Sequence, residues 1–391
     1  MTACLLDCSQ AFDSCRFDKM FQKLLDKKLP AVIIRVLIFI YEEQEAYVSI
    51  DGKTSSTFKI TNGTRQGAVA SPRFFVTYID ELLSKLRQLG DGCKIGGIWL
   101  GAAGYSDDLI LLAPHCSALQ NMLNTCSSYA NEHNLKFSTN PIPNLSKTKC
   151  MYFSTRRNIV YPSMLKLGDH TLPWVETAEH IGHTLHQSGK MDHDSKIKRA
   201  IYIGKTSEIR RNFGWAHPNQ TIRAAEIFAG DHTGSNLWLL SSESAESYYK
   251  SWNTFVKLVW NVPRSTHTDI VEGLLAKDFV TCRNQILSRY CKFYQSLLAS
   301  PSREIRILAS IVTHDLESTT KKNIDHITSL SGGFSPIEYG KERIQTQLPV
   351  KSVAAWKSGM LKSMLDQRRV LWDEAKETAQ IQGWIDSLCS T

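Results

Sequence analysis

The sequence has no long hydrophobic run, no basic segment before its first apolar stretch and no regular cysteine spacing. No apolar stretch of the 391 residues reaches the roughly 18 residues that a membrane helix needs, and the best candidate, residues 29–41, contains Arg35. The apolar stretch at the N-terminus includes Asp7 and has no basic residues before it, which argues against a signal peptide. The ten cysteines are scattered, so we expect free thiols in a reducing intracellular compartment, either nucleus or cytoplasm.

Internal repeats, low-complexity tracts and the cysteine spacing of a zinc site are also missing. The composition, 42% hydrophobic and 21% charged, is that of a globular protein and excludes a collagen, a coiled-coil rod or a disordered tail. The length predicts two or three domains. A net charge of +8 is compatible with nucleic-acid binding without being diagnostic of it.

Positive charge is concentrated in residues 190–223, which hold eight basic and three acidic residues. Aromatic side chains interleave with the basic ones there, as in many nucleic-acid-binding surfaces. An ordinary solvated helix face explains the same pattern equally well. The basic residues are Lys190, Lys196, Lys198, Arg199, Lys205, Arg210, Arg211 and Arg223.

Apolar periodicity predicts an α+β domain over the first 155 or so residues and a mostly helical remainder. Helices are expected at residues 17–25, at 31–41 as a mostly buried helix, after the N-cap Ser71 with Pro72, and at 119–129. Strands are expected at residues 3–6, 95–100, 109–112 and 149–154, with hairpins over 47–60 and 165–185 and a loop at 330–336.

Three short polar segments lie beside these strands: residues 6–13, 62–67 and 105–108. A turn breaks the alternation of a strand, so Asp107 and Asp108 could face one side, and Asp7 on a neighbouring strand would join them. Carboxylates that close repel and raise one another's pKa unless a cation lies between them. Two Mg²⁺ ions about 3.5–4 Å apart, held in this way, clamp the oxygens of a phosphoryl displacement.

The segments resemble, in order, blocks A, B and C of the palm of reverse transcriptases, most closely those of non-LTR (LINE-like) retrotransposons. "LLDCSQAFD" is similar to block A, "NGTRQGAVASP" to block B and "GYSDDLILLA" to block C. "LKFSTNPIPNLSKTKCMYF" resembles block D, and "HIGHTL" is weakly similar to the block E primer grip.

The resemblance implies an α+β polymerase palm, an antiparallel sheet with packed helices, over residues 1–160. A primer-grip hairpin and a basic helical thumb would follow over 161–260, and a helical region of unknown role over 261–391. The implied activity is RNA-directed DNA polymerisation, in which two Mg²⁺ ions, or Mn²⁺, support transfer of dNTPs onto a DNA primer along an RNA template.

The resemblance also assigns roles to single residues. Asp7 and Asp107 would ligate both metal ions, and Asp108 would support them less directly. Either Lys147 or Lys149 would protonate the pyrophosphate leaving group. Substrate contacts would come from Phe12, an aromatic gate against the ribose 2′-OH, and from Arg65, Gln66, Gly67 and Tyr105, while Lys190, Lys196, Lys198, Arg199, Lys205, Arg210 and Arg211 would contact nucleic acid.

Asp13 also matches block A, and we expect it to cap a helix. We expect His180, His183, His186 and His193 to be surface or hydrogen-bonded side chains. The family's fingers should precede block A, but only six residues precede Asp7, which suggests a truncated chain or a late gene-model start. An inactive, nucleic-acid-binding remnant of a retroelement is therefore the alternative, and the oligomeric state stays open.

Overall fold

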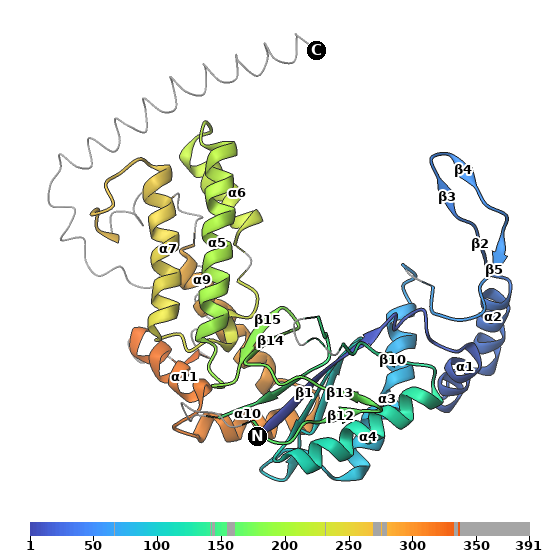
Figure 1. Ribbon diagram of the computed structural model, residues 1–391. Coiled ribbons are helices and arrows are strands. Elements are labelled where there is room, and N and C mark those ends of the chain that lie inside the picture. Colours follow the sequence, from blue (N-terminus) through green and yellow to red (C-terminus); the bar gives the residue numbers. More distant parts are fainter. Residues whose placement is uncertain are drawn as a thin grey trace. The chain divides into compact units, whose positions relative to one another are not determined.

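The computed structural model describes residues 1–65, 67–140, 142, 145–154, 161–230, 232–268, 275, 280–331, 335 and 336. The chain divides into two compact units at Lys190 and Met191 (Figure 1). The first is an antiparallel sheet with helices and the second is mostly helical, so the α+β fold class is confirmed at this level. Within the described ranges, none of the helices combines the length and the apolarity of a membrane span.

A five-stranded antiparallel sheet forms the centre of the first unit, with β1 inside it. Its apolar side chains alternate between two cores: Cys4, Leu6 and Cys8 enter the large core, and Leu5 enters a smaller one on the opposite face. A strand buried on both faces is what the apolar start of the chain predicts. The strands are β1 (Thr2–Ser9), β8 (Ala102–Tyr105), β9 (Asp108–Ala113), β10 (Lys136–Phe137) and β11 (Lys149–Tyr152), in the order β10-β1-β9-β8 with β11 also paired to β1.

Helices α3 and α4 supply much of the large core. The Tyr129 hydroxyl donates to the Tyr78 carbonyl at 2.6 Å, and the Tyr78 hydroxyl donates to the His133 carbonyl at 2.6 Å. These buried bonds join α3 to the end of α4 and satisfy the polar ends of both rings. The helices of this unit are α1 (Phe17–Asp26), α2 (Ala31–Glu42), α3 (Ser71–Leu89) and α4 (Cys116–Glu132).

The prediction of a mostly buried helix over 31–41 is wrong. Only Ile34 and Tyr41 of α2 are buried, while Val36 and Phe39 are exposed. Apolar composition measures the preference for burial, but burial itself requires a facing surface, and α2 meets one only along the stripe of its buried side chains.

Two predicted helix caps are also corrected. α3 begins at Ser71, whose hydroxyl donates to the Arg65 carbonyl at 2.6 Å instead of capping, although Pro72 lies in the first turn as predicted. Asp13 does not cap α1, because Arg16 holds the N-cap position and no side chain caps there. For Ser71 the local motif is compatible with a cap, but the bond to the Arg65 carbonyl takes its place.

The expected strand at 95–100 is a two-stranded hairpin, because Gly96 and Gly97 adopt positive φ and reverse the chain. The hairpin over 47–60 turns at Asp51-Gly52 as predicted but consists of two short ladders, and residues 165–185 form two hairpins instead of one. These strands are β2 (Glu45–Ala46), β3 (Ser49–Ile50), β4 (Lys53–Thr54), β5 (Phe58–Lys59), β6 (Lys94–Ile95), β7 (Ile98–Trp99), β12 (Lys166–Leu167), β13 (His170–Thr171), β14 (Thr177–His180) and β15 (His183–His186).

The second unit packs its helices around fully buried Trp238, whose indole N–H donates to an Asp194 carboxylate oxygen at 2.8 Å. Asn323 bridges this core, since its side chain accepts from the Leu240 amide and donates to the Trp238 carbonyl, both at 2.8 Å. Part of the predicted loop 330–336 and residues 337–391 lie outside the described residues. The elements are α5 (Asp192–Phe213), α6 (Pro218–Phe228), the 3-10 turn η1 (Ser235–Leu237), α7 (Glu243–Val259), α9 (Cys282–Leu298), α10 (Arg303–His314) and α11 (Thr319–Leu330).

Candidate functional site

Asp7 and Asp108 lie directly opposite each other in the ladder between β1 and β9. The neighbours Leu6 and Leu109 point into the large core, so both aspartates project from the other face of the sheet. The polar residue at position 7 is tolerated because β1 ends two residues later, where the burial of the strand falls off. Two carboxylates therefore share one face near one end of the sheet.

Asp107 occupies the turn between β8 and β9, next to Ser106, which adopts a positive φ of 56°. Burial raises the pKa of the Asp7 carboxyl, and the negative charges of Asp107 and Asp108 raise it further, Asp107 more strongly than Asp108. The turn thus brings the charge of Asp107 close to Asp7, as expected from the break in strand alternation.

Lys147 lies beside Asp7, with its ammonium Nζ 3.7 Å from Oδ2 of the carboxylate. Its charge counteracts the rise in the pKa of Asp7. The Lys147 side chain is 70% exposed beside Asp7, whereas Lys149 lies within β11, opposite Leu5 in the ladder with β1. The geometry therefore distinguishes the two lysines that the sequence left as alternatives, and favours Lys147 at the carboxylates.

The donor set fits a hard divalent cation. Asp7 and Asp107 offer carboxylate oxygens as ligands, and the charge of Asp107 is close enough to raise the pKa of Asp7. Among the residues that the structure describes, no group of three or more His, Cys, Asp or Glu side chains is arranged to hold a metal ion. Mg²⁺ often binds through only one or two carboxylates and completes its shell with water and substrate phosphates, so a pair of aspartates suffices for the fit.

The raised pKa of Asp7 predicts that the carboxylate costs stability at neutral pH when no cation is present. Because the pKa of Asp7 is raised in the folded state, the protonated carboxyl favours folding. This contribution to stability is fully present below the ordinary pKa of aspartate and is lost as the pH rises through the folded pKa. Asp7→Asn should therefore raise the free energy of unfolding at pH 7 in EDTA, and the difference should shrink as the pH falls towards about 4.

Urea unfolding of both proteins at several pH values measures this difference. Asp18→Asn is the matched control with the opposite sign, because the Arg16 guanidinium lowers the pKa of Asp18. That variant should lose stability at pH 7. If Asp7→Asn were instead less stable than the parent chain at pH 7, the raised pKa assigned to Asp7 would be wrong.

Phe12 follows β1 in a turn and is half-buried against the large core. Its ring lies 4.9 Å from that of Phe75 on α3, and its carbonyl accepts from the Thr64 amide at 2.7 Å. Gly63 passes close by, with φ of +90°, and a Cβ there would lie 2.9 Å from the Asp13 Cα. The first and second polar segments are therefore packed together around Phe12.

The other predicted substrate contacts are partly described. Arg65 and Tyr105 are exposed, and Gly67 is exposed with φ of +81° in open space. Gln66 lies outside the described residues. Tyr105 ends β8 and lies directly opposite Asp108 in the ladder with β9, so the structure places it beside the aspartates. Arg65 and Gly67 lie in an exposed loop, whose left-handed glycine can approach a ligand closely with its backbone.

The sequence reasoning did not find His180 as a neighbour of the site. Burial lowers the pKa of His180, and the negative charge of Asp108 opposes this shift. Asp108 is thus close to His180 of β14, while the charge of Asp107 raises the pKa of Asp7 more strongly than that of Asp108 does. The weak resemblance of residues 180–185 to block E was the available signal, but it carried no expectation of proximity to Asp108.

The basic residues predicted to contact nucleic acid have different surroundings in the structure. Lys198 is engaged in the fold, with its ammonium 3.3 Å from Asp194 and bonded to the Thr233 carbonyl at 2.6 Å. Arg199, Arg210 and Arg211 line a groove of about 640 Å³ beside α5. Lys190, Lys196 and Lys205 do not line it.

Comparison with known proteins agrees with the arrangement of these segments. Residues 2–185 match the family model described as reverse transcriptase (RNA-dependent DNA polymerase). The chain is 28% identical over 132 residues, 34% of its length, to a retrovirus-related Pol polyprotein from a type-1 R2 retrotransposable element of Nasonia vitripennis. It is 28% identical over 174 residues, 43% of its length, to the corresponding polyprotein of the type-2 element R2DM of Drosophila melanogaster. It spans only 13% and 16% of these two relatives.

Proposed function

We propose that this chain, whose residues 2–185 are a reverse transcriptase domain distantly related to the Pol proteins of R2 non-LTR retrotransposons, carries out RNA-directed DNA synthesis. The observation that carries the proposal is the placement of Asp7 opposite Asp108 with the charge of Asp107 and the ammonium of Lys147 beside it. Carboxylates that can bind metal ions, together with a lysine at the same end of the sheet, suit nucleotidyl transfer.

In this proposal Asp7 and Asp107 hold two Mg²⁺ ions, or Mn²⁺, and Asp108 supports them. When bound, the ions supply charge stabilisation for the reacting phosphate. Phe12 lies under the sugar of the incoming dNTP, where it excludes a 2′-OH. Arg65, Gln66, Gly67 and Tyr105 contact the incoming nucleotide and the template, and Lys147 donates a proton to the pyrophosphate leaving group.

The partners in this proposal are an RNA template, a DNA primer and dNTPs. Residues 1–160 serve as the palm, 161–260 as the primer-grip hairpin and thumb, and 261–391 have no assigned role. The excess of basic residues on and near α5 supports a thumb that follows the nucleic-acid backbone, because backbone contacts are made mainly by lysine and arginine.

The test is extension of a DNA primer on an RNA template by the 391-residue chain, with dNTPs and Mg²⁺. We expect incorporation that EDTA abolishes and Mg²⁺ or Mn²⁺ restores. If the folded chain binds the primer–template but incorporates nothing with either ion, the alternative of a non-catalytic nucleic-acid-binding remnant replaces the proposal. The same alternative would apply if Mn²⁺ did not bind at Asp7 and Asp107.

Lys147→Gln should slow incorporation by roughly 10²- to 10⁴-fold, the range expected for loss of one general acid. Lys149→Gln is the matched control, because it removes the same charge from a lysine two residues away that lies within β11. Single-turnover extension across a pH series measures both. The role of Lys147 is wrong if both variants slow the reaction equally, or if the loss in Lys147→Gln does not vary with pH.

A further inference from the structure

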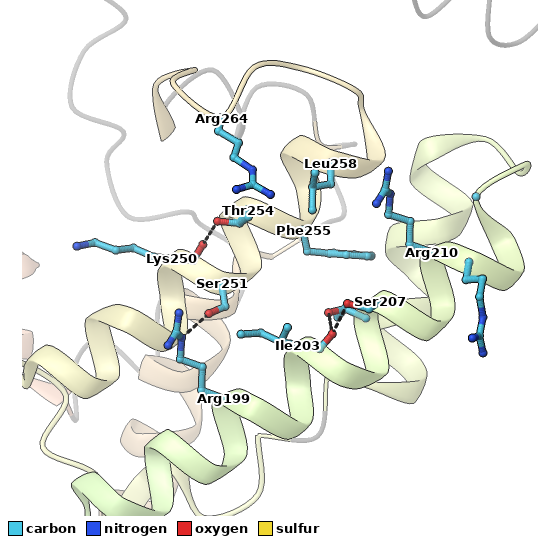
Figure 2. Close-up of a pocket in the computed structure, with 13 residues that line it drawn as sticks. Arg199, Ile203, Ser207, Arg210, Lys250, Ser251, Thr254, Phe255, Leu258 and Arg264 are labelled. Carbon is cyan, nitrogen blue, oxygen red and sulfur yellow. Dashed lines mark hydrogen bonds between the residues drawn. The ribbon is translucent and has the colours of Figure 1, made fainter.

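The groove of about 640 Å³ in the second unit lies between α5, α7 and the segment that follows α7 (Figure 2). Five cationic side chains and no acidic ones line it. They come from three separate segments of the chain: Arg199, Arg210 and Arg211 from α5, Lys250 from α7, and Arg264 from the segment after it. Only the α5 half of this set was visible as a basic stretch in the sequence.

The floor of the groove is apolar and fixed. Phe255 is buried between the two helices, and Ile203 and Leu258 lie beside it (Figure 2). Arg199 is held at one end, since its Nε donates to the Ser251 hydroxyl at 2.8 Å. The groove is thus a crevice between directly packed helices, and most of its lining residues belong to α5 and α7.

The other cations of the groove face solvent. Arg210, Lys250 and Arg264 are exposed, and among the described residues no carboxylate forms an ion pair with their side chains. Hydroxyls of Thr206, Ser207 and Thr254 lie among them. These hydroxyls donate to main-chain carbonyls of their own helices, so the cations are the groups that can bind phosphate. Unpaired cations over an apolar floor suit a run of nucleotides, whose phosphates bind the cations and whose bases can rest on the apolar surface.

The size of the groove favours one strand. A volume of about 640 Å³ is in the range that holds a drug-sized ligand, so the groove has room for a short stretch of one strand and not for a duplex. We infer that the groove between α5 and α7 binds the phosphate backbone of a single-stranded nucleic-acid segment, apart from the carboxylates of the first unit. The inference rests on the proposed function for the class of partner and requires no catalysis.

The test compares two triple variants with the same change in net charge. Arg210→Gln/Lys250→Gln/Arg264→Gln removes one cation from each of the three segments that line the groove, which are α5, α7 and the segment after α7. Arg289→Gln/Lys292→Gln/Arg303→Gln is the control, because these residues are exposed on α9 and α10 and do not line the groove. Lys196 is left out of the control, since it lies one turn before Arg199 on the same stripe of α5.

Binding is measured in EDTA by fluorescence anisotropy, with a single-stranded oligouridylate and an RNA–DNA hybrid of equal length as probes. The groove variant should lose roughly tenfold to a hundredfold in affinity for the single strand, and the slope of log affinity against log salt should become shallower by about 2, or about 0.7 per lost contact. The control variant should change affinity less than about threefold.

Three outcomes would overturn the inference: equal losses in the two triple variants, an equal or larger loss on the hybrid, or displacement of the oligonucleotide by millimolar UTP, which indicates a mononucleotide pocket. Arg210→Lys/Arg264→Lys keeps the charges and should retain binding, which separates loss of contacts from misfolding. Asp107→Asn should leave this binding unchanged, so failure of the polymerase proposal and failure of this inference are distinguishable.

Discussion

Asp107→Asn is expected to reduce Mg²⁺-dependent nucleotide incorporation by about a thousandfold or more, equivalent to about 4 kcal/mol of transition-state stabilisation. The turn between β8 and β9 places the charge of Asp107 close to Asp7, and this charge raises the pKa of Asp7 more strongly than that of Asp108 does. An amide has nearly the same shape as the carboxylate but no negative charge. Primer extension under single-turnover conditions measures the loss, and affinity for the primer–template should change little.

Asp108→Asn is the matched comparison within the same turn. Asp108 acts less on Asp7 and also faces His180, so we expect a smaller loss than for Asp107→Asn. Asp18→Asn removes an exposed carboxylate on α1 and should not change the rate. Equal losses for Asp107→Asn and Asp108→Asn would contradict the different roles proposed for them.

Phe12→Val is expected to shift the preference for dNTP over rNTP towards rNTP by roughly a hundredfold, or ~3 kcal/mol. A phenyl ring cannot accept a hydrogen bond and occupies the space that a 2′-OH would need, so the clash acts on the ribonucleotide only. Single-nucleotide extension of a primed RNA template with each substrate gives the ratio of kcat/KM values. Dependence on Mg²⁺ should not change.

Because the Phe12 ring contacts the Phe75 ring, a purely structural role in the core is the main alternative to a role in sugar selection. Phe12→Val should itself cost about 1–3 kcal/mol of stability, because it removes buried ring contacts. Phe75→Leu removes the other ring of the same pair and serves as the control: it should lower stability without shifting the sugar preference. An unchanged ratio in a folded, active Phe12→Val protein would mean that Phe12 serves only in core packing.

Local sequence was sufficient for the elements whose pattern and partners agree. The apolar start of the chain predicted a buried strand, and β1 is buried on both faces. The turn at Asp51-Gly52 and the start of α3 near Pro72 were also predictable, since each depends on the backbone preferences of one or two residues. The order of the three polar segments predicted the family match of residues 2–185.

Tertiary contacts decided the rest. The sequence left Lys147 and Lys149 as alternatives, and only the pairing of β11 with β1 fixed Lys149 in the ladder and left Lys147 beside Asp7. The apolar helix α2 was predicted to be buried, but its composition could not show that a facing surface is missing along Val36 and Phe39.

The groove of the second unit also depends partly on local sequence and partly on tertiary packing. The sequence by itself determined that positive charge and helical pattern coincide around α5, because both are properties of neighbouring residues. It could not determine that Lys250 and Arg264 join Arg210, since those residues lie about 40 to 54 positions further along the chain. Packing of α7 against α5 decided that, because hydrophobic burial of Phe255 between the helices brings together charges that have no local relation.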